Sequence, residues 1–160
     1  MKQHFDTFLC VVDALDKSEV EYILIGGYAV IIHGLPRFTI DMDIFVKMEK
    51  NNIDLLRQTL TDIFEDIQLA EITFEEIEQY PVIRYGAPDG FVIDIIGRLG
   101  IAYCYDDLEY ESIDIEGHSV RVATPETLYR LKHDTARPQD KIDADFLKNL
   151  IEKRRISGGR

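Results

Sequence analysis

The sequence predicts an α/β (α+β) fold, because helical and strand patterns alternate along the chain. Apolar residues recur at the spacing of an amphipathic helix in three segments, namely 3–17, 53–66 and 141–155. Shorter runs that are wholly apolar or alternate with period two indicate strands at 22–25, 39–46, 81–85 and 91–96. Because 46% of the 160 residues are apolar, the chain can bury one substantial core, and we expect a single domain over 1–160.

Turn and cap residues define the shorter elements. An apolar run from Tyr22 to Ile25 stops at Gly26-Gly27, and a short helix over 28–33 follows. The segment 86–90 is dense in turn formers and joins the strands at 81–85 and 91–96. The acidic stretch 71–78 carries no pattern that assigns it to a helix or a strand.

The last third of the chain combines a hairpin with two helices. Ser112 to Ile115 and Ser119 to Val122 flank a Glu116-Gly117 turn, which predicts a hairpin. Thr124 is a helix cap before Pro125, so a helix is expected to about residue 134. Pro138 marks a break before the last helix. We therefore expect a sheet core at about 20–123 and a C-terminal helical part at about 124–156.

Composition limits the classes of partner. The formal net charge of -12 disfavours extensive binding to DNA or to long RNA. No segment has the length of apolar sequence that a membrane span requires, and Met1 to His4 lacks the apolar run of a signal peptide, so a cytoplasmic protein is expected. Cys10 and Cys104 are far apart among apolar residues, which predicts buried free thiols.

Three aspartates are the candidate metal ligands. Asp41 and Asp43 lie two residues apart on a predicted strand, so their carboxylates point to the same face. Asp143 and Asp145 have the same spacing but lie in a helical pattern, where they diverge. Asp94 lies within an apolar strand, where a carboxylate requires a cation or another partner.

The partner of Asp94 has two interpretations. It can be a metal ion shared with Asp41 and Asp43, or it can be an ion pair with Arg84 or Arg98. Exposure on an edge strand would also explain a carboxylate at this position. The coincidence with the pair on the preceding strand favours metal ions.

Gly26-Gly27 is the candidate phosphate-binding turn. The pair ends a buried strand and opens a helix, so backbone N–H groups can meet phosphate oxygens without an obstructing side chain. A tight turn that binds no ligand is the alternative. About fifteen residues separate this turn from the Asp41-x-Asp43 strand, an order that favours the phosphate interpretation.

These residues form part of a known pattern. The segment Gly-Gly-Tyr-Ala-Val-Ile-Ile-His-Gly at 26–34, followed by Arg37-x-Thr39-x-Asp41-x-Asp43, closely resembles the signature of the DNA polymerase beta-like nucleotidyltransferase superfamily. Within it the chain is similar to the abortive-infection AbiEii branch and its short relatives, many of which belong to toxin-antitoxin pairs. The segment 124–132 and the pattern Arg137-x-x-Asp140-x-x-Asp143 resemble the C-terminal motifs of that branch.

The resemblance implies a mixed sheet flanked by helices, with two Mg²⁺ or Mn²⁺ ions held by Asp41, Asp43 and Asp94. It implies that Asp94 acts as general base or second-metal ligand, that Lys132 contacts the triphosphate, and that Asp140 orients the lysine or the nucleotide. The residues that it implies for nucleotide or phosphate binding are Gly26, Gly27, Arg37, Thr39 and Lys132.

The activity that the resemblance implies is transfer of a nucleoside monophosphate from a nucleoside triphosphate, such as ATP, to a hydroxyl of a protein or an RNA, including a tRNA end. The alternative is a non-catalytic or regulatory module that acts through an antitoxin-like protein partner. A metal-dependent phosphohydrolase is disfavoured, because the sequence offers no histidine-rich ligand set.

Three further residues have two interpretations each. His33 is expected to be a packed, hydrogen-bonded core residue rather than a catalytic group. Arg37 can bind substrate phosphate or neutralise the aspartates at 41 and 43, and the first is favoured. Lys132 and Asp140 can form a surface ion pair instead of a site.

Overall fold

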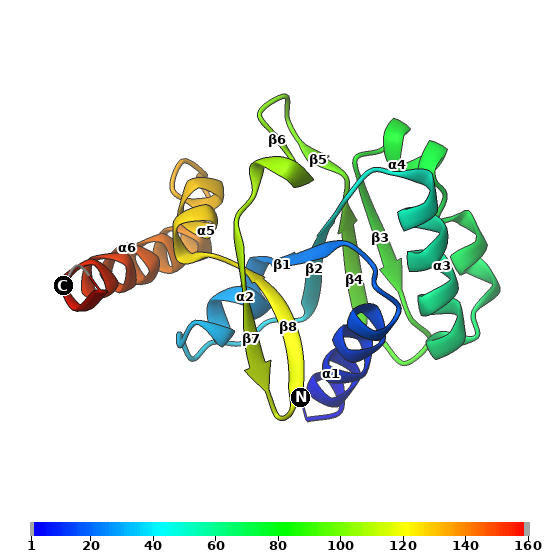
Figure 1. Ribbon diagram of the computed structural model, residues 1–160, viewed down its shortest axis with the longest axis horizontal. Coiled ribbons are helices and arrows are strands. Elements are labelled where there is room, and N and C mark those ends of the chain that lie inside the picture. Colours follow the sequence, from blue (N-terminus) through cyan, green and yellow to red (C-terminus); the bar gives the residue numbers. More distant parts are fainter. Residues whose placement is uncertain (1, 159–160) are drawn as a thin grey trace.

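The structure is a computed structural model that describes residues 2–158, and its centre is a six-stranded mixed sheet. The strand order is β3-β4-β2-β1-β8-β7 (Figure 1). These strands are β1 (Tyr22–Ile25), β2 (Asp41–Val46), β3 (Val82–Gly86), β4 (Val92–Ile96), β7 (Tyr110–Ile115) and β8 (His118–Ala123). A separate two-stranded hairpin is formed by β5 (Arg98–Leu99) and β6 (Tyr103–Cys104).

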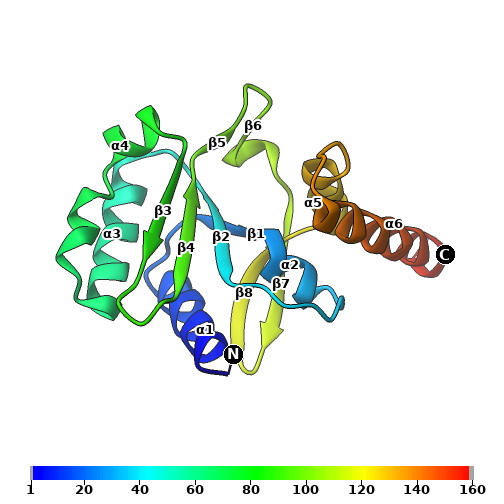
Figure 2. The ribbon, with the colours of Figure 1, turned by 180° about the vertical axis from the view of Figure 1, so that it is seen from behind.

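Helices surround the sheet and extend beyond one side of it. They are α1 (Lys2–Lys17), α2 (Gly26–Ile32), α3 (Lys50–Phe64), α4 (Phe74–Gln79), α5 (Pro125–Lys132) and α6 (Pro138–Gly158). Two short 3-10 helices are η1 (Ile67–Glu71) and η2 (Tyr105–Asp107). Helices α5 and α6 pack on each other at the far end of the molecule from α3 (Figures 1 and 2). None of the helices within residues 2–158 is long and apolar enough to cross a bilayer.

Alternation along the central strands separates the core from the opposite face. Met42 and Ile44 of β2 and Ile93 of β4 are fully buried, while Asp41 and Asp43, which alternate with Met42 and Ile44 along β2, are only partly buried. Strands β1 and β2 are antiparallel, whereas β1 with β8 and β2 with β4 are parallel. The mixed α/β architecture expected from the sequence is confirmed.

Most of the expected elements are present, and three expectations need correction. The last helix begins at Pro138 itself, before its predicted start at residue 141, because proline fits the first turn of a helix, where its N–H is not needed. The unassigned stretch 71–78 contains most of α4, whose cap Thr73 accepts a hydrogen bond from the Glu76 N–H. Cys10 and Cys104 are free as expected, but both are exposed, so their predicted burial is wrong.

The buried side chain of Asn52 links α3 to the residues that flank β1 and β2. Asn52, at the start of α3, accepts a hydrogen bond from the Glu21 N–H at 2.8 Å. Its amide nitrogen donates to the Glu21 carbonyl at 3.0 Å and to the Lys47 carbonyl at 2.9 Å. Asn52 therefore fixes the antiparallel ends of β1 and β2 with three hydrogen bonds.

Asn52→Ala is expected to lower the free energy of unfolding by about 2 to 4 kcal/mol, because it leaves main-chain polar groups without partners in a buried place. Urea denaturation measures the change. Asn51→Ala is the matched control, since Asn51 is the exposed preceding residue of the same helix. Equal effects of the two substitutions would contradict this role of the Asn52 side chain.

Candidate functional site

Strand register places the three candidate carboxylates on one face of the sheet. Asp43 of β2 is the direct partner of Asp94 on the parallel strand β4. Asp41 lies two residues before Asp43, so its side chain points to the same face. The sequence pattern at 41 and 43 and the interruption at 94 therefore belong to one cluster, which we call the aspartate cluster (Asp41, Asp43 and Asp94).

The Gly26-Gly27 turn abuts the aspartate cluster. Ile25 pairs with Asp43 across β1 and β2, so the end of β1 delivers the turn to that carboxylate. Gly26 has a φ of 73°, and a Cβ there would overlap the Asp43 carboxylate. A Cβ on Gly27 would lie 2.6 Å from Arg37 Nη1 and 2.5 Å from Thr39 Oγ1. The predicted phosphate turn, acidic strand, Arg37 and Thr39 are thus brought together.

Arg84 of β3 contacts two of the three carboxylates. Its Nε donates to Asp94 Oδ1 at 2.9 Å, and its Nη2 donates to Asp94 Oδ2 at 3.0 Å. The same Nη2 donates to Asp41 Oδ2 at 2.8 Å. Of the two arginines that the sequence offered to Asp94, the structure therefore pairs Arg84 with it, opposite Asp94 in the β3–β4 register.

Asp43 lacks such a partner. Its Oδ1 is buried and has no hydrogen-bond partner within residues 2–158. Burial, followed by the charge of Asp94 and a hydrogen bond with it, raises the pKa of Asp43 to about 7, and Lys132 opposes this shift. A buried carboxylate oxygen without a partner suits a cation ligand, because a positive charge would compensate its desolvation.

The C-terminal helices bring a second charged cluster to the site. Lys132 Nζ, at the end of α5, lies 3.2 Å from Asp140 Oδ1 and 3.0 Å from Asp143 Oδ2 of α6. Arg37 Nη1 lies 3.4 Å from the same Asp143 oxygen, although neither cation meets that oxygen in hydrogen-bond geometry. Burial opposes ionisation of Asp140, but a hydrogen bond from Thr135 and the charge of Lys132 outweigh it and lower its pKa.

This cluster bears on two of the interpretations made from sequence. The Lys132–Asp140 pair is largely buried, with 12% and 9% of the two side chains exposed, so it is not a surface ion pair. Arg37 pairs with Asp143 and not with Asp41 or Asp43. Asp143 belongs to the C-terminal motif that the resemblance covers, but no role was predicted for it, and it is fully buried.

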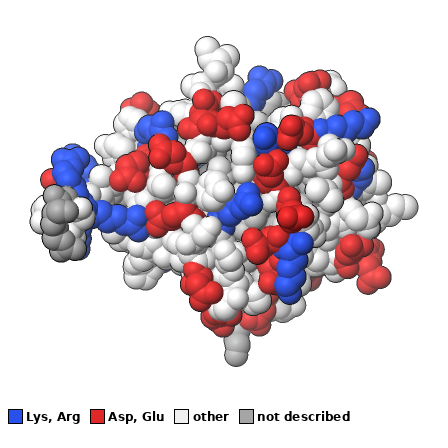
Figure 3. All heavy atoms as spheres, in the orientation of Figure 1, with Lys and Arg blue, Asp and Glu red and all other residues white. Residues whose placement is uncertain are grey.

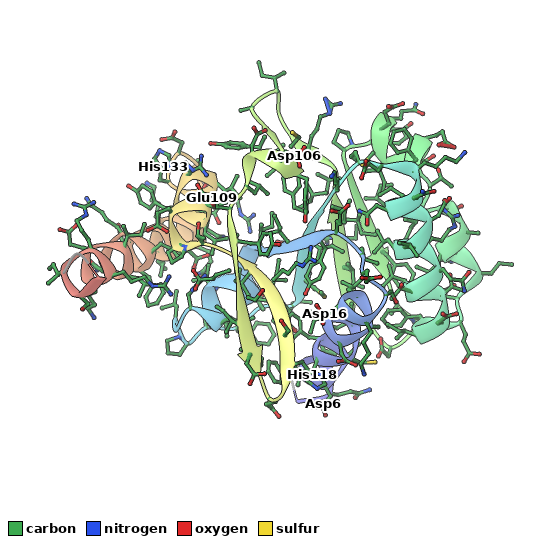
Figure 4. The ribbon with its side chains drawn as sticks, in the orientation of Figure 1. Asp6, Asp16, Asp106, Glu109, His118 and His133 are labelled. Atoms are coloured by element: carbon green, nitrogen blue, oxygen red, sulfur yellow. The ribbon has the colours of Figure 1, made fainter. Side chains whose placement is uncertain are left out.

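Other polar groups lie apart from the aspartate cluster. His33 Nε2 is 2.8 Å from the Ala123 carbonyl oxygen, and burial lowers the pKa of the imidazole, as suits a packed histidine. His118 lies beside α1, where its Nδ1 is 2.9 Å from Asp13 Oδ1 (Figure 4). As the side chains stand, no three His, Cys, Asp or Glu residues within 2–158 are grouped as ligands of one metal ion.

A pocket of about 560 Å³ lies elsewhere, beyond the ends of β2 and β4. Its lining includes Met48, Phe74, Ile77 and Tyr105, and none of the site residues predicted from sequence. The turn at Gly26 lies at the opposite ends of these strands, because β1 runs antiparallel to β2. The aspartate cluster therefore lies outside this pocket.

Comparison with known proteins identifies the family of this chain. The family model described as nucleotidyl transferase AbiEii toxin, type IV toxin-antitoxin system, matches residues 8–153. The chain belongs to this AbiEii nucleotidyltransferase family. The match includes the glycine turn, the aspartate cluster and the Lys132 region of this AbiEii-family chain. No curated protein matches the sequence.

Solved structures show the same fold at low identity. A protein of Thermotoga maritima, described as a candidate nucleotidyltransferase, has a TM-score of 0.57 and 13% identity over 96% of both chains. The lincosamide antibiotic adenylyltransferase LnuA, solved with lincomycin, has a TM-score of 0.54 and 15% identity over 94% of this chain and 98% of its own. ANT(2'')-Ia, solved with adenylyl-2''-tobramycin, has a TM-score of 0.51 and 15% identity over 92% of this chain and 87% of its own. The AbiEii-family chain therefore has a nucleotidyltransferase fold.

Gly26→Ala is expected to destabilise the protein by about 2 kcal/mol more than Gly117→Ala does. Both glycines have positive φ, but a Cβ on Gly117 would meet open space, whereas one on Gly26 would meet Asp43. Thermal unfolding of the two variants separates the clash from the backbone strain that they share. Equal losses would show that Asp43 can move away without cost.

Asp43→Asn is expected to raise stability in EDTA by about 1 to 3 kcal/mol above pH 7. Because the pKa of Asp43 is about 7 in the folded chain against an ordinary value of 3.8, the folded state binds the extra proton between these values. Wild-type stability from this group therefore falls as pH rises from about 4 to about 7, and the asparagine variant escapes the loss.

Thermal denaturation from pH 4 to pH 8 measures the effect. Asp145→Asn is the control, since Asp145 is exposed on α6. The advantage of Asp43→Asn is expected to shrink toward pH 4, and an advantage that does not change with pH would contradict the assignment.

Proposed function

We propose that this protein is a metal-dependent nucleotidyltransferase that transfers a nucleoside monophosphate from a nucleoside triphosphate to a hydroxyl group and releases pyrophosphate. One observation carries the proposal: the carboxylates of Asp41, Asp43 and Asp94 share one face of the sheet, beside a turn where Gly26 has no room for a side chain. Membership of the AbiEii family supports it. One neighbour of the same fold is named an adenylyltransferase and another was solved with adenylyl-2''-tobramycin, which makes ATP the first triphosphate to test.

The carboxylates of the aspartate cluster suit Mg²⁺ or Mn²⁺, which prefer oxygen ligands, and two ions are proposed. The unpartnered Oδ1 of Asp43 supports the fit. When bound, such ions would neutralise the triphosphate and stabilise charge at the α-phosphorus. Asp41 and Asp43 would hold them from β2, and Asp94 would bind the second ion or accept the proton of the attacking hydroxyl.

The remaining residues would bind and orient the triphosphate. Main-chain N–H groups of the Gly26-Gly27 turn can approach phosphate oxygens, because no Cβ stands in the way. Lys132 and Arg37 are proposed to contact the polyphosphate, and both are anchored by Asp143. Asp140 would hold Lys132 in place, since it is at ion-pair distance from the ammonium group.

A protein or an RNA end is the proposed acceptor. Acidic side chains are spread across the face shown in Figure 3, and the net charge of -12 disfavours a long polyanion more than a compact acceptor. An antitoxin-like protein partner is proposed from the description of the family as part of a toxin-antitoxin system.

Label transfer tests the proposal. Purified protein is incubated with Mg²⁺ or Mn²⁺, each α-labelled triphosphate, and either total tRNA or cell protein as acceptor. Asp41→Asn and Asp43→Asn are each expected to reduce transfer at least about 100-fold, because the charge-stabilising ions lose a ligand. Asp145→Asn should keep wild-type transfer, since its side chain is exposed on α6.

A second candidate function is a regulatory module that acts through a protein partner without catalysis. The contact of Arg84 with Asp41 and Asp94 favours it, because an internal cation already balances two of the carboxylates. The same assay decides between the two. If no label is transferred at any metal concentration and Asp43→Asn still binds the partner as wild type does, the regulatory module is supported and the enzyme proposal is rejected.

A further inference from the structure

Arg84 lies in one row with two members of the aspartate cluster. It is paired with Asp94 in the antiparallel β3–β4 register, and Asp94 is paired with Asp43 in the parallel β4–β2 register. Side chains paired across strands point to the same face. The strand register therefore places the backbone of Arg84 directly beside that of Asp94, with its side chain on the face of the aspartate cluster.

The contacts of Arg84 are the ones a bridging cation would need. Its Nη2 is shared between Asp41 Oδ2 at 2.8 Å and Asp94 Oδ2 at 3.0 Å, while its Nε holds the second oxygen of Asp94. Hydrogen bonds to Asp94, followed by the charges of Asp94 and Asp41, raise the pKa of Arg84, so the group stays charged. A metal ion on Asp41 and Asp94 would need the same oxygen lone pairs.

The exposed position of the Arg84 side chain allows its guanidinium to move away from Asp41 and Asp94. Its side chain is 62% exposed, against 14% for Asp94, and β3 is an edge strand with β4 as its only neighbour in the six-stranded sheet that residues 2–158 form. A guanidinium that swings into water exchanges its ion pairs for hydration at small cost. The carboxylate of Asp94 cannot escape in the same way and would need a replacement cation.

We propose that Arg84 is an internal counter-ion that competes with divalent cations for Asp41 and Asp94, and that it thereby sets the affinity of the site for metal. This inference rests on the proposed function, since it assumes that the aspartate cluster binds cations. The proposed role predicts an effect on metal affinity opposite to that of a residue that supports the metal site. Loss of Arg84 should strengthen metal binding, whereas loss of a support would weaken it.

Mn²⁺ binding to the intact protein tests the competition, measured by the EPR signal of free Mn²⁺ at low ionic strength. Arg84→Gln is expected to bind Mn²⁺ about ten times more tightly than wild type, because the competing charge and its hydrogen bonds are gone. Arg84→Lys keeps the charge but cannot form the bidentate contact, and should fall between the two. In EDTA, Arg84→Gln should melt at a lower temperature than wild type, because the carboxylates then repel each other.

Arg98→Gln is the matched control for charge. Arg98 is an exposed arginine four residues after Asp94 and forms no ion pair within residues 2–158. It should change Mn²⁺ affinity less than twofold. Binding by Arg84→Gln that equals or falls below wild type would overturn the competition, while the wild type would still bind the metal. If neither wild type nor any variant binds Mn²⁺, the cation site itself is lost, and the proposed function with it.

Discussion

The pairing of Asp43 with Asp94 across two parallel strands is the constraint on which the arrangement of this site depends. Parallel partners hold their side chains close together on one face, and here both side chains are carboxylates. Burial and mutual repulsion raise the pKa of Asp43 to about 7. A sheet that keeps this register must supply positive charge nearby, and Arg84, Lys132 and added cations are the sources that the chain can use.

The C-terminal helices are part of the site as well as of the scaffold. Asp143 on α6 is fully buried between Lys132 and Arg37, which come from the end of α5 and from the loop before β2. Removing one member of such a buried network would leave the others with uncompensated charge. The α5–α6 pair is therefore tied electrostatically to the segment that leads into the acidic strand, although the two are about a hundred residues apart in sequence.

Local pattern was sufficient to predict much of the fold and part of the site. Alternation around Asp41 and Asp43 gave their shared face, and the apolar run at Tyr22–Ile25 gave β1 with its correct bounds. The pairing of Asp143 with Arg37 was not predicted, because the two residues are far apart in sequence and no local spacing encodes their contact. The choice of Arg84 over Arg98 likewise required the β3–β4 register, which only the hairpin geometry fixes.

Arg84 contacts the aspartate cluster and Lys132 acts on Asp43 through its charge, and the two cations differ in how firmly they are held. Lys132 is 12% exposed and lies between Asp140 and Asp143, so moving it would take the nearest counter-ion away from two buried carboxylates. Arg84 is 62% exposed on an edge strand, and water can replace its contacts. Under the proposed function, the fixed charge of Lys132 would suit the binding of a polyphosphate, and the exposed charge of Arg84 would suit a position that metal ions are proposed to enter. The two cations thus differ in exposure in the way that the proposed exchange of Arg84 for metal ions requires.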